Sequence, residues 1–126
     1  MFEHGQFYWN ELITPEVEKA KAFYAKTLGW TYETMPMPEG DYVLAKLGEN
    51  MAGGIMQTPA DMGGAPSQWY AYIAVDDVDA RAASATKAGG TLLRPIFDVE
   101  GVGRIAILTD AAGAVIGLIT PAPMES

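Results

Sequence analysis

The sequence holds few side chains of the kinds that usually carry out catalysis. It has no cysteine and a single histidine, His4, which excludes a thiolate nucleophile, an interior serine–histidine–aspartate triad and a multi-histidine metal site. Chemistry must come from carboxylates, tyrosines, arginines or lysines, or from a borrowed cofactor. We expect His4, which precedes the first predicted strand, to be exposed to solvent.

Four of the remaining candidates have strand-like spacing. Trp9 and Glu11 are two residues apart in one aromatic and branched segment, and Tyr70 and Tyr72 are two apart in another. Alternate side chains of a strand point to the same face, so each pair should share a face. The two pairs are separated by the same interval of 61 residues.

Arg104 is a further candidate, because it follows the short glycine-bearing stretch Gly101-Val102-Gly103. A guanidinium group there could hold an anionic substrate. The commoner outcome for such an arginine is a surface ion pair, here with Asp98 or Glu100.

Composition limits the class of protein and its partners. With 126 residues, of which 49% are hydrophobic and 19% charged, the chain is expected to be a single domain over residues 1–126. Its net charge of −8 would repel a phosphate backbone or an anionic membrane surface, so neither nucleic acid nor membrane is an expected partner. The absence of cysteine and of an apolar leader segment favours a cytoplasmic location.

The chain contains an internal repeat. Residues 7–58 align without a gap to residues 68–119, at an offset of 61, with nine identities that include Val17/Val78 and Gly29/Gly90. Composition alone would give about three or four. We therefore predict two modules, one at about 7–58 and one at about 68–120, joined by a linker over about 58–67 that contains two prolines and two glycines.

Each module is predicted to be a strand, a helix and three strands. In the first, Thr14-Pro15-Glu16 offers a hydroxyl cap, a proline and an acidic first turn, and Gly29 ends the helix. In the second, Asp76 is the expected cap. The predicted strands span 7–13, 30–35, 42–47 and 52–57, then 69–75, 91–96, 104–108 and 114–120.

The motifs and their order resemble those of the vicinal oxygen chelate superfamily, whose members include glyoxalase I, bleomycin- and fosfomycin-resistance proteins and extradiol dioxygenases. The motifs are Phe23-Tyr24 followed by Leu28-Gly29-Trp30, residues 73–77 (IAVDD), and the closing residues 115–118 (VIGL). The resemblance implies an α+β glyoxalase-like fold, in which tandem βαβββ modules form a cup-shaped, partly open sheet of about eight strands around a ligand cavity.

The resemblance also implies where a metal would bind in metal-dependent members. The positions are Trp9, Tyr70 and Gly117, and subtraction of 61 from the last gives Met56. None is a histidine or a carboxylate, whereas divalent metal sites need two or three such ligands. We therefore expect no metal and no other cofactor, and we expect Met56 to serve packing or to line the cavity rather than to bind metal.

If these positions face the cavity, Trp9, Tyr70 and Tyr72 line it and Glu11 is a carboxylate among aromatic rings. Burial without a partner would raise the pKa of Glu11. The side chain could then act as a general base or anchor a cationic or hydrogen-bond-donating ligand. The structural alternatives are a hydrogen bond with Tyr72 or a position at the rim in water. Arg104 would lie at the mouth.

Two functions remain open. The first is a metal-independent, bleomycin-resistance-like protein that binds a small organic ligand through Trp9, Glu11, Met56, Tyr70, Tyr72 and Arg104. The second is a glyoxalase-like lyase or isomerase that uses Glu11 or a divalent metal. In either case we expect a homodimer, because apolar faces left exposed favour symmetric pairing.

Overall fold

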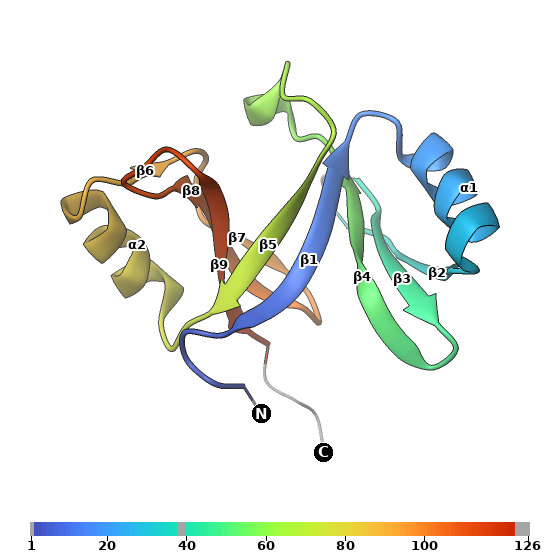
Figure 1. Cartoon of the computed structure of the whole chain (residues 1–126), viewed down its shortest axis with the longest axis horizontal. Helices are drawn as coiled ribbons and strands as arrows, with labels where there is room; N and C mark the ends of the chain where they lie inside the picture. The colour runs from blue at the N-terminus through green and yellow to red at the C-terminus, as the bar shows by residue number, and fades with distance from the viewer. Residues whose placement is uncertain (1, 38–39, 123–126) are drawn as a thin grey trace. The chain divides into compact units, whose positions relative to one another are not determined.

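A computed structural model describes residues 2–37 and 40–122 and has the predicted α+β class (Figure 1). The elements follow the order expected from two modules. The first contains β1 (Phe7–Thr14), α1 (Val17–Leu28), β2 (Thr31–Met35), β3 (Tyr42–Leu47) and β4 (Asn50–Gln57). The second contains β5 (Gln68–Ala74), α2 (Val78–Lys87), β6 (Thr91–Leu92), β7 (Phe97–Val99), β8 (Gly103–Thr109) and β9 (Val115–Pro121).

The chain forms two compact units whose boundaries fall inside strands β1 and β5. Asn10–Tyr70 is the first-module unit, and Met1–Trp9 with Ala71–Ser126 is the second-module unit. The amino-terminal segment joins the second-module unit through backbone bonds, in which Gly5 donates to Ala74 and Ala74 donates to Gln6. The predicted linker belongs to the first-module unit and includes a short 3-10 helix, Ala60–Met62.

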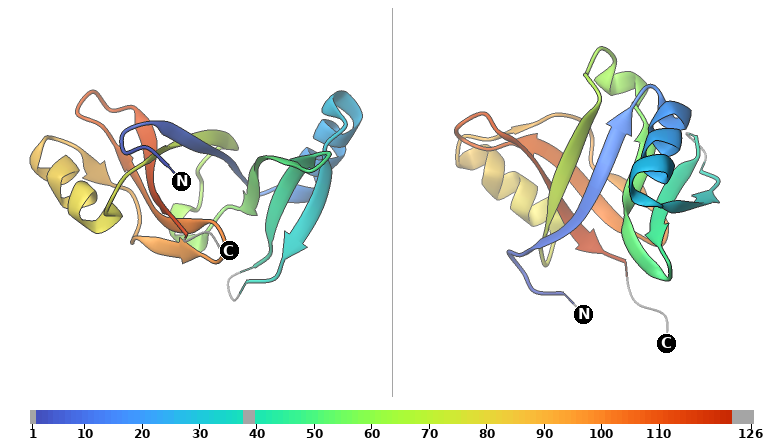
Figure 2. Two further views of the ribbon diagram at one scale, coloured as in Figure 1. Left: turned by 90° about the horizontal axis from the view of Figure 1, so that it is seen from below. Right: turned by 45° about the vertical axis from the view of Figure 1, so that its right-hand side comes forward.

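In the first-module unit the strands run in the order β2-β3-β4-β1, and β1 pairs with β4 in parallel. Helix α1 covers one face of β2, β3 and β4 (Figure 2). The core under the helix consists of Leu12, Val43 and Ile55 from three adjacent strands. Residues that alternate with these three therefore lie on the face turned away from α1.

The start of α1 departs from the prediction in one detail. The N-cap residue is Glu16, not Thr14, but the Thr14 hydroxyl still accepts a hydrogen bond from the Glu16 backbone N–H at 3.0 Å. Thr14 is buried and also shares a 2.7 Å hydrogen bond with the Ser67 hydroxyl. Gly29 ends the helix in the left-handed conformation, with φ of 77°, as expected.

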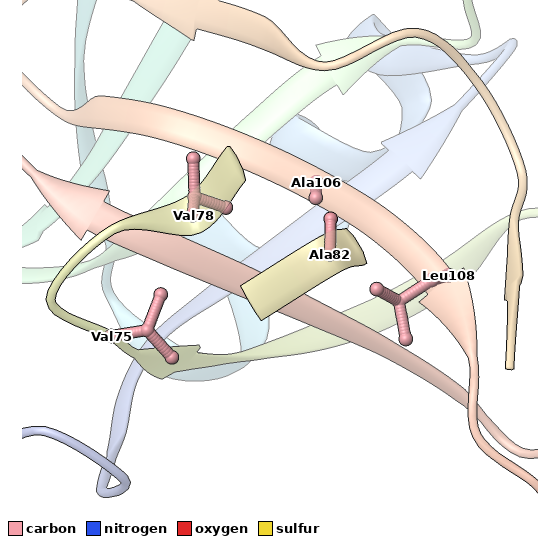
Figure 3. Close-up of a cluster of buried hydrophobic side chains, with 5 residues drawn as sticks. All are labelled: Val75, Val78, Ala82, Ala106 and Leu108. Carbon is pink, nitrogen blue, oxygen red and sulfur yellow. The ribbon is translucent and has the colours of Figure 1, made fainter. Parts of the chain in front are cut away.

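In the second-module unit the strands run β5-β9-β8-β6, with β7 also paired to β8. Side chains of α2 pack on β8 and on the end of β5 (Figure 3). The N-cap of α2 is Asp77 rather than the predicted Asp76, and its carboxylate accepts from the backbone of Asp79 and Ala80. The buried cluster comprises Val75, Val78, Ala82, Ala106 and Leu108.

The strand predicted over 91–96 is wrong in its extent. Strand β6 (Thr91–Leu92) pairs with β8, the Leu93 backbone N–H still donates to Ile107 of β8, and a further strand, Phe97–Val99, resumes the pairing. Pro95 lies between them and has no backbone N–H to donate to a neighbouring strand. The sequence pattern did not show that β7 exists.

The gap-free repeat is also wrong for the later strands. Glu11 pairs with Gly54 between β1 and β4, and its repeat mate Tyr72 pairs with Gly117 between β5 and β9. The first strands are offset by 61 residues, whereas Gly54 and Gly117 are offset by 63. The second module therefore has two extra residues before its last strands. Gly54, not Met56, is the counterpart of Gly117.

An ion pair at the start of α2 leads to a prediction about pKa. Two guanidinium nitrogens of Arg81 donate to the two carboxylate oxygens of Asp76, each at 2.9 Å. The hydrogen bond from Arg81 is the main reason that the pKa of Asp76 falls from 3.8 to about 2. Arg81→Met should raise that pKa toward 3.8 in an NMR pH titration, whereas Arg104→Met should leave it low.

The sign of the linked stability effect follows from this lowered pKa. The contribution of Asp76 is present above the ordinary pKa of 3.8 and disappears as the pH falls through about 2. Arg81→Met should therefore remove stability at neutral pH but not below pH 2. An unchanged pKa in the variant would contradict the assignment to Arg81.

Candidate functional site

The most deeply buried carboxylate of the described residues is Glu11, in the part of β1 that belongs to the first-module unit. Its side chain is 0% exposed. The hydroxyl of Tyr42, on β3, donates a hydrogen bond to Glu11 Oε2 at 2.5 Å. A buried carboxylate costs free energy unless it is hydrogen-bonded, so this hydrogen bond offsets part of the cost of burying Glu11.

Gly54 on β4 makes room for this contact. If a Cβ atom were added at Gly54, it would overlap the hydroxyl and ring of Tyr42. Tyr42 itself is 2% exposed, so its ring has little space in which to move. Glu11 and Gly54 are register partners and Tyr42 alternates with Val43, so the three residues lie on the face turned away from α1.

The second-module unit repeats the glycine but not the carboxylate. Tyr72, the repeat mate of Glu11, is 0% exposed, and its ring occupies the space beside its register partner Gly117. In one module, then, the strand glycine accommodates a tyrosine of β3, and in the other a tyrosine of β5. The two sites are therefore chemically different in spite of the repeat.

The other predicted site residues are divided between the two units. Tyr70 belongs to the first-module unit and is buried, and this burial raises its pKa above 10.0. Met56 is half-buried on β4, opposite both Ile13 and Tyr42. Trp9 is half-buried and, like Tyr72, belongs to the second-module unit. The joint ligand site of these residues stays a prediction.

Arg104, on β8, is held by two carboxylates. Its guanidinium donates to Asp79 through two nitrogens, at 2.8 and 3.1 Å, and to Asp98 at 3.0 Å. These bonds, with Asp79 the largest cause, raise the pKa of Arg104. The ion pair with Asp98 was one of the two outcomes suggested by the sequence, and binding of an anionic ligand by Arg104 stays a prediction.

The donor set does not fit a divalent metal. The register replaces Met56 by Gly54 at the ligand position on β4, so two of the four positions, Gly54 and Gly117, have no side chain at all. Within residues 2–37 and 40–122, no three histidine, cysteine, aspartate or glutamate side chains gather closely enough to hold an ion. Metal-dependent members of such a family need several such ligands.

The hydrogen bond between Glu11 and Tyr42 was not predicted from the sequence. A hydrogen bond with Tyr72 was one of the two structural alternatives for Glu11, and it stays a prediction. Residues 42–45 (YVLA) are all apolar or aromatic, so the sequence alone does not indicate which of them face the helix. The missing information was the register that sets Gly54 beside Glu11.

Comparison with known proteins agrees with this fold. A family model described as the glyoxalase/bleomycin resistance protein/dioxygenase superfamily matches residues 6–118. The chain belongs to this superfamily, as its motifs indicated. In addition, no helix among the described residues has the length and apolar character needed to cross a membrane.

Two curated relatives illustrate the range of the family. The chain is 41% identical over 124 residues to a putative glyoxylase, CFP32, of Mycobacterium tuberculosis. It is 32% identical over 137 aligned residues to the anthracycline biosynthesis protein DnrV of Streptomyces peucetius. These matches cover 98% of this chain but only 47% and 50% of the relatives, so the chain spans about half their length.

Solved structures show the same fold at low sequence identity. A hypothetical protein of Bacillus halodurans matches with a TM-score of 0.69 and 10% identity, over 98% of this chain and 99% of that one. Methylmalonyl-CoA epimerase of Mycobacterium tuberculosis matches with a TM-score of 0.62 and 20% identity, over 98% and 94%.

Proposed function

We propose that this protein binds a small, hydrogen-bond-donating organic ligand without a metal, and that Glu11 is the acceptor that anchors it. The observation that carries the proposal is the fully buried Glu11 carboxylate, held by the Tyr42 hydroxyl on the face turned away from α1. An ionised carboxylate can accept about four hydrogen bonds, and the bond from Tyr42 is one of them. Trp9, Tyr70 and Tyr72 are the aromatic residues proposed to contact a planar ligand.

The energetic argument for a binding role rests on the cost of burial. Stability alone favours an apolar side chain at a fully buried strand position, because the desolvation of a carboxylate costs free energy even when the group is hydrogen-bonded. Groups that are buried at such a cost are enriched at functional sites. The buried neighbours of Glu11 in the same strand, such as Leu12 and Ile13, have the apolar side chains expected there, and Glu11 does not.

The relatives suggest a chemical probe. The resemblance to a protein named for anthracycline biosynthesis supports a planar, hydroxylated ligand class. Doxorubicin is an anthracycline with several hydroxyl groups and one ammonium group, which suits a carboxylate acceptor beside aromatic rings. Its intrinsic fluorescence allows a direct titration.

Glu11→Gln should weaken doxorubicin binding by about tenfold or more, because a charge-assisted hydrogen bond of about 1.5–3 kcal/mol becomes a neutral one. The amide keeps the volume and can still accept from Tyr42, so the circular dichroism spectrum should not change. Glu18→Gln is the matched control, since Glu18 lies on α1 with its side chain 86% exposed. Equal affinity of wild type and Glu11→Gln would contradict the proposal.

A lyase or isomerase is the second candidate, with Glu11 as a general base that moves a proton of the bound substrate. The identity of 41% to a putative glyoxylase favours it. Elemental analysis separates the two candidates in part. About one Zn, Ni, Mn or Fe per chain, together with activity lost to a chelator, would replace the metal-free proposal by a metal-dependent enzyme.

We also propose that the protein is a homodimer. Helix α1 leaves Phe23 and Leu28 more than half exposed, at 57% and 52%. Apolar side chains of this size are commonly covered by a partner, and symmetric pairing of identical chains is the commonest way. Sedimentation equilibrium at tens of micromolar should give twice the chain mass, and a monomer would contradict this proposal.

A further inference from the structure

We propose that Tyr42 is a positioning residue that holds the Glu11 carboxylate in one orientation for the ligand, and that Gly54 is required because it gives the Tyr42 hydroxyl its place. This inference rests on the proposed function of Glu11. It assigns a role to two residues outside the predicted site.

Tyr42 is well suited to fix the carboxylate. It is 2% exposed, and its backbone on β3 is paired on both sides, with Met35 of β2 and Met56 of β4. A tyrosine held in this way has few alternative rotamers, so its hydroxyl stays in place. The 2.5 Å bond to Oε2 therefore restrains the rotation of the Glu11 carboxylate about its last side-chain torsion.

The requirement for Gly54 is steric rather than conformational. Gly54 is not among the described glycines with positive φ, so its backbone angles are open to any residue. The obstacle to a larger residue is the Tyr42 side chain, which occupies the space of a Cβ atom. Alanine at this position would displace the hydroxyl from Glu11 while leaving the tyrosine in the chain.

Two variants therefore remove the contact in different ways. Tyr42→Phe deletes the hydroxyl and keeps the ring, and Gly54→Ala keeps the hydroxyl but displaces it. Tyr32→Phe is the matched control, because the Tyr32 hydroxyl donates to the Lys21 backbone carbonyl at 2.7 Å in the same unit and does not contact Glu11. Tyr42→Phe is close to isosteric and should fold even if Gly54→Ala does not.

The first measurement is made without ligand. In wild type the Tyr42 hydroxyl proton should give a resolved downfield NMR resonance, because it is buried and donates to a carboxylate. The side-chain carboxyl carbon of Glu11 is assigned by its absence from the spectrum of Glu11→Gln. Tyr42→Phe and Gly54→Ala should both lose the downfield proton and shift the Glu11 carbon, and Tyr32→Phe should do neither.

The second measurement is doxorubicin affinity. Tyr42→Phe should weaken binding by about five- to tenfold, the scale of one hydrogen bond. In a Glu11→Leu background, which has no acceptor for either Tyr42 or the ligand, Tyr42→Phe should cause no further loss of affinity, because a positioning residue acts only through its partner. Additive losses, or an unshifted Glu11 carbon in Tyr42→Phe, would overturn the inference.

The two measurements also separate this inference from the proposed function. If Glu11→Gln binds doxorubicin as tightly as wild type, the anchoring role of Glu11 fails, and the positioning role for the ligand fails with it. If Glu11→Gln weakens binding but Tyr42→Phe does not, the proposed function stands and the role of Tyr42 is overturned.

Discussion

Gly117→Ala is expected to lower the free energy of unfolding by about 3 kcal/mol, which is near the upper end of the usual cost of overfilling a packed interior. Any Cβ atom at this position would overlap the ring of Tyr72, and that ring is 0% exposed. Gly117 lies between β5 and β8, with Tyr72 and Ile107 as its register partners, so the strand has little freedom to move away. The midpoint of thermal unfolding should fall by about 10 °C.

A compensating variant tests the steric explanation. Tyr72→Leu removes the ring from the space beside Gly117, so Gly117→Ala should cost much less in that background than in wild type. A double-mutant cycle on the free energy of unfolding, from urea titrations, should give a coupling of about 1 kcal/mol or more. Equal costs in the two backgrounds would show that the clash is not the cause.

Amide hydrogen exchange shows which strands lose stability in Gly117→Ala. Gly117 and Tyr72 both belong to the second-module unit. The loss of amide protection in Gly117→Ala should therefore be largest in β5, β8 and β9, and smaller in β3 and β4. Uniform loss over the whole chain would mean that the two units open together.

The α+β class and the order of the elements could be predicted because local chemistry determines them. Gly29 ends α1 in a left-handed conformation, and acidic caps begin α2. The repeat added the expectation that the two halves share one architecture. These signals depend on neighbours within a few residues, which a single sequence displays directly.

The pairing of strands could not be predicted in the same way. An offset of 61 residues fits the first strands and the helices, but β4 and β9 are offset by 63, as Gly54 and Gly117 show. A shift of two keeps every side chain on its face, so the hydrophobic pattern gives no warning of it. This even shift led the sequence analysis to Met56 instead of Gly54.

The partners of charged side chains were predicted only in part, for a related reason. Arg104 was expected to pair with Asp98 or Glu100, which are close in sequence, and it does bind Asp98. Its bidentate partner, Asp79, is 25 residues away on α2. Likewise, Tyr42 is 31 residues from Glu11. Such contacts depend on how helices and strands pack, which one sequence without an alignment does not reveal.

Ile55→Ala is expected to lower the free energy of unfolding by about 3 kcal/mol and to leave doxorubicin affinity unchanged. Ile55 is 0% exposed and packs with Leu12 and Val43 beneath α1, so its truncation leaves a cavity in the core of the first-module unit. Ile55→Val, which removes one methyl group, should cost about 1 kcal/mol and calibrates the effect. Both values come from urea unfolding.

The affinity measurement tests whether packing on one face of the first-module sheet affects ligand binding on the other face. Ile55 follows Gly54 directly in β4, but its side chain points toward α1, whereas Glu11 and Tyr42 lie on the opposite face. At a temperature where the variant is fully folded, its doxorubicin affinity should match wild type within about twofold. A tenfold loss of doxorubicin affinity in Ile55→Ala would mean that a change of packing under α1 alters the position of Glu11. Weak binding by a variant of the site would then not be evidence that the substituted residue contacts the ligand.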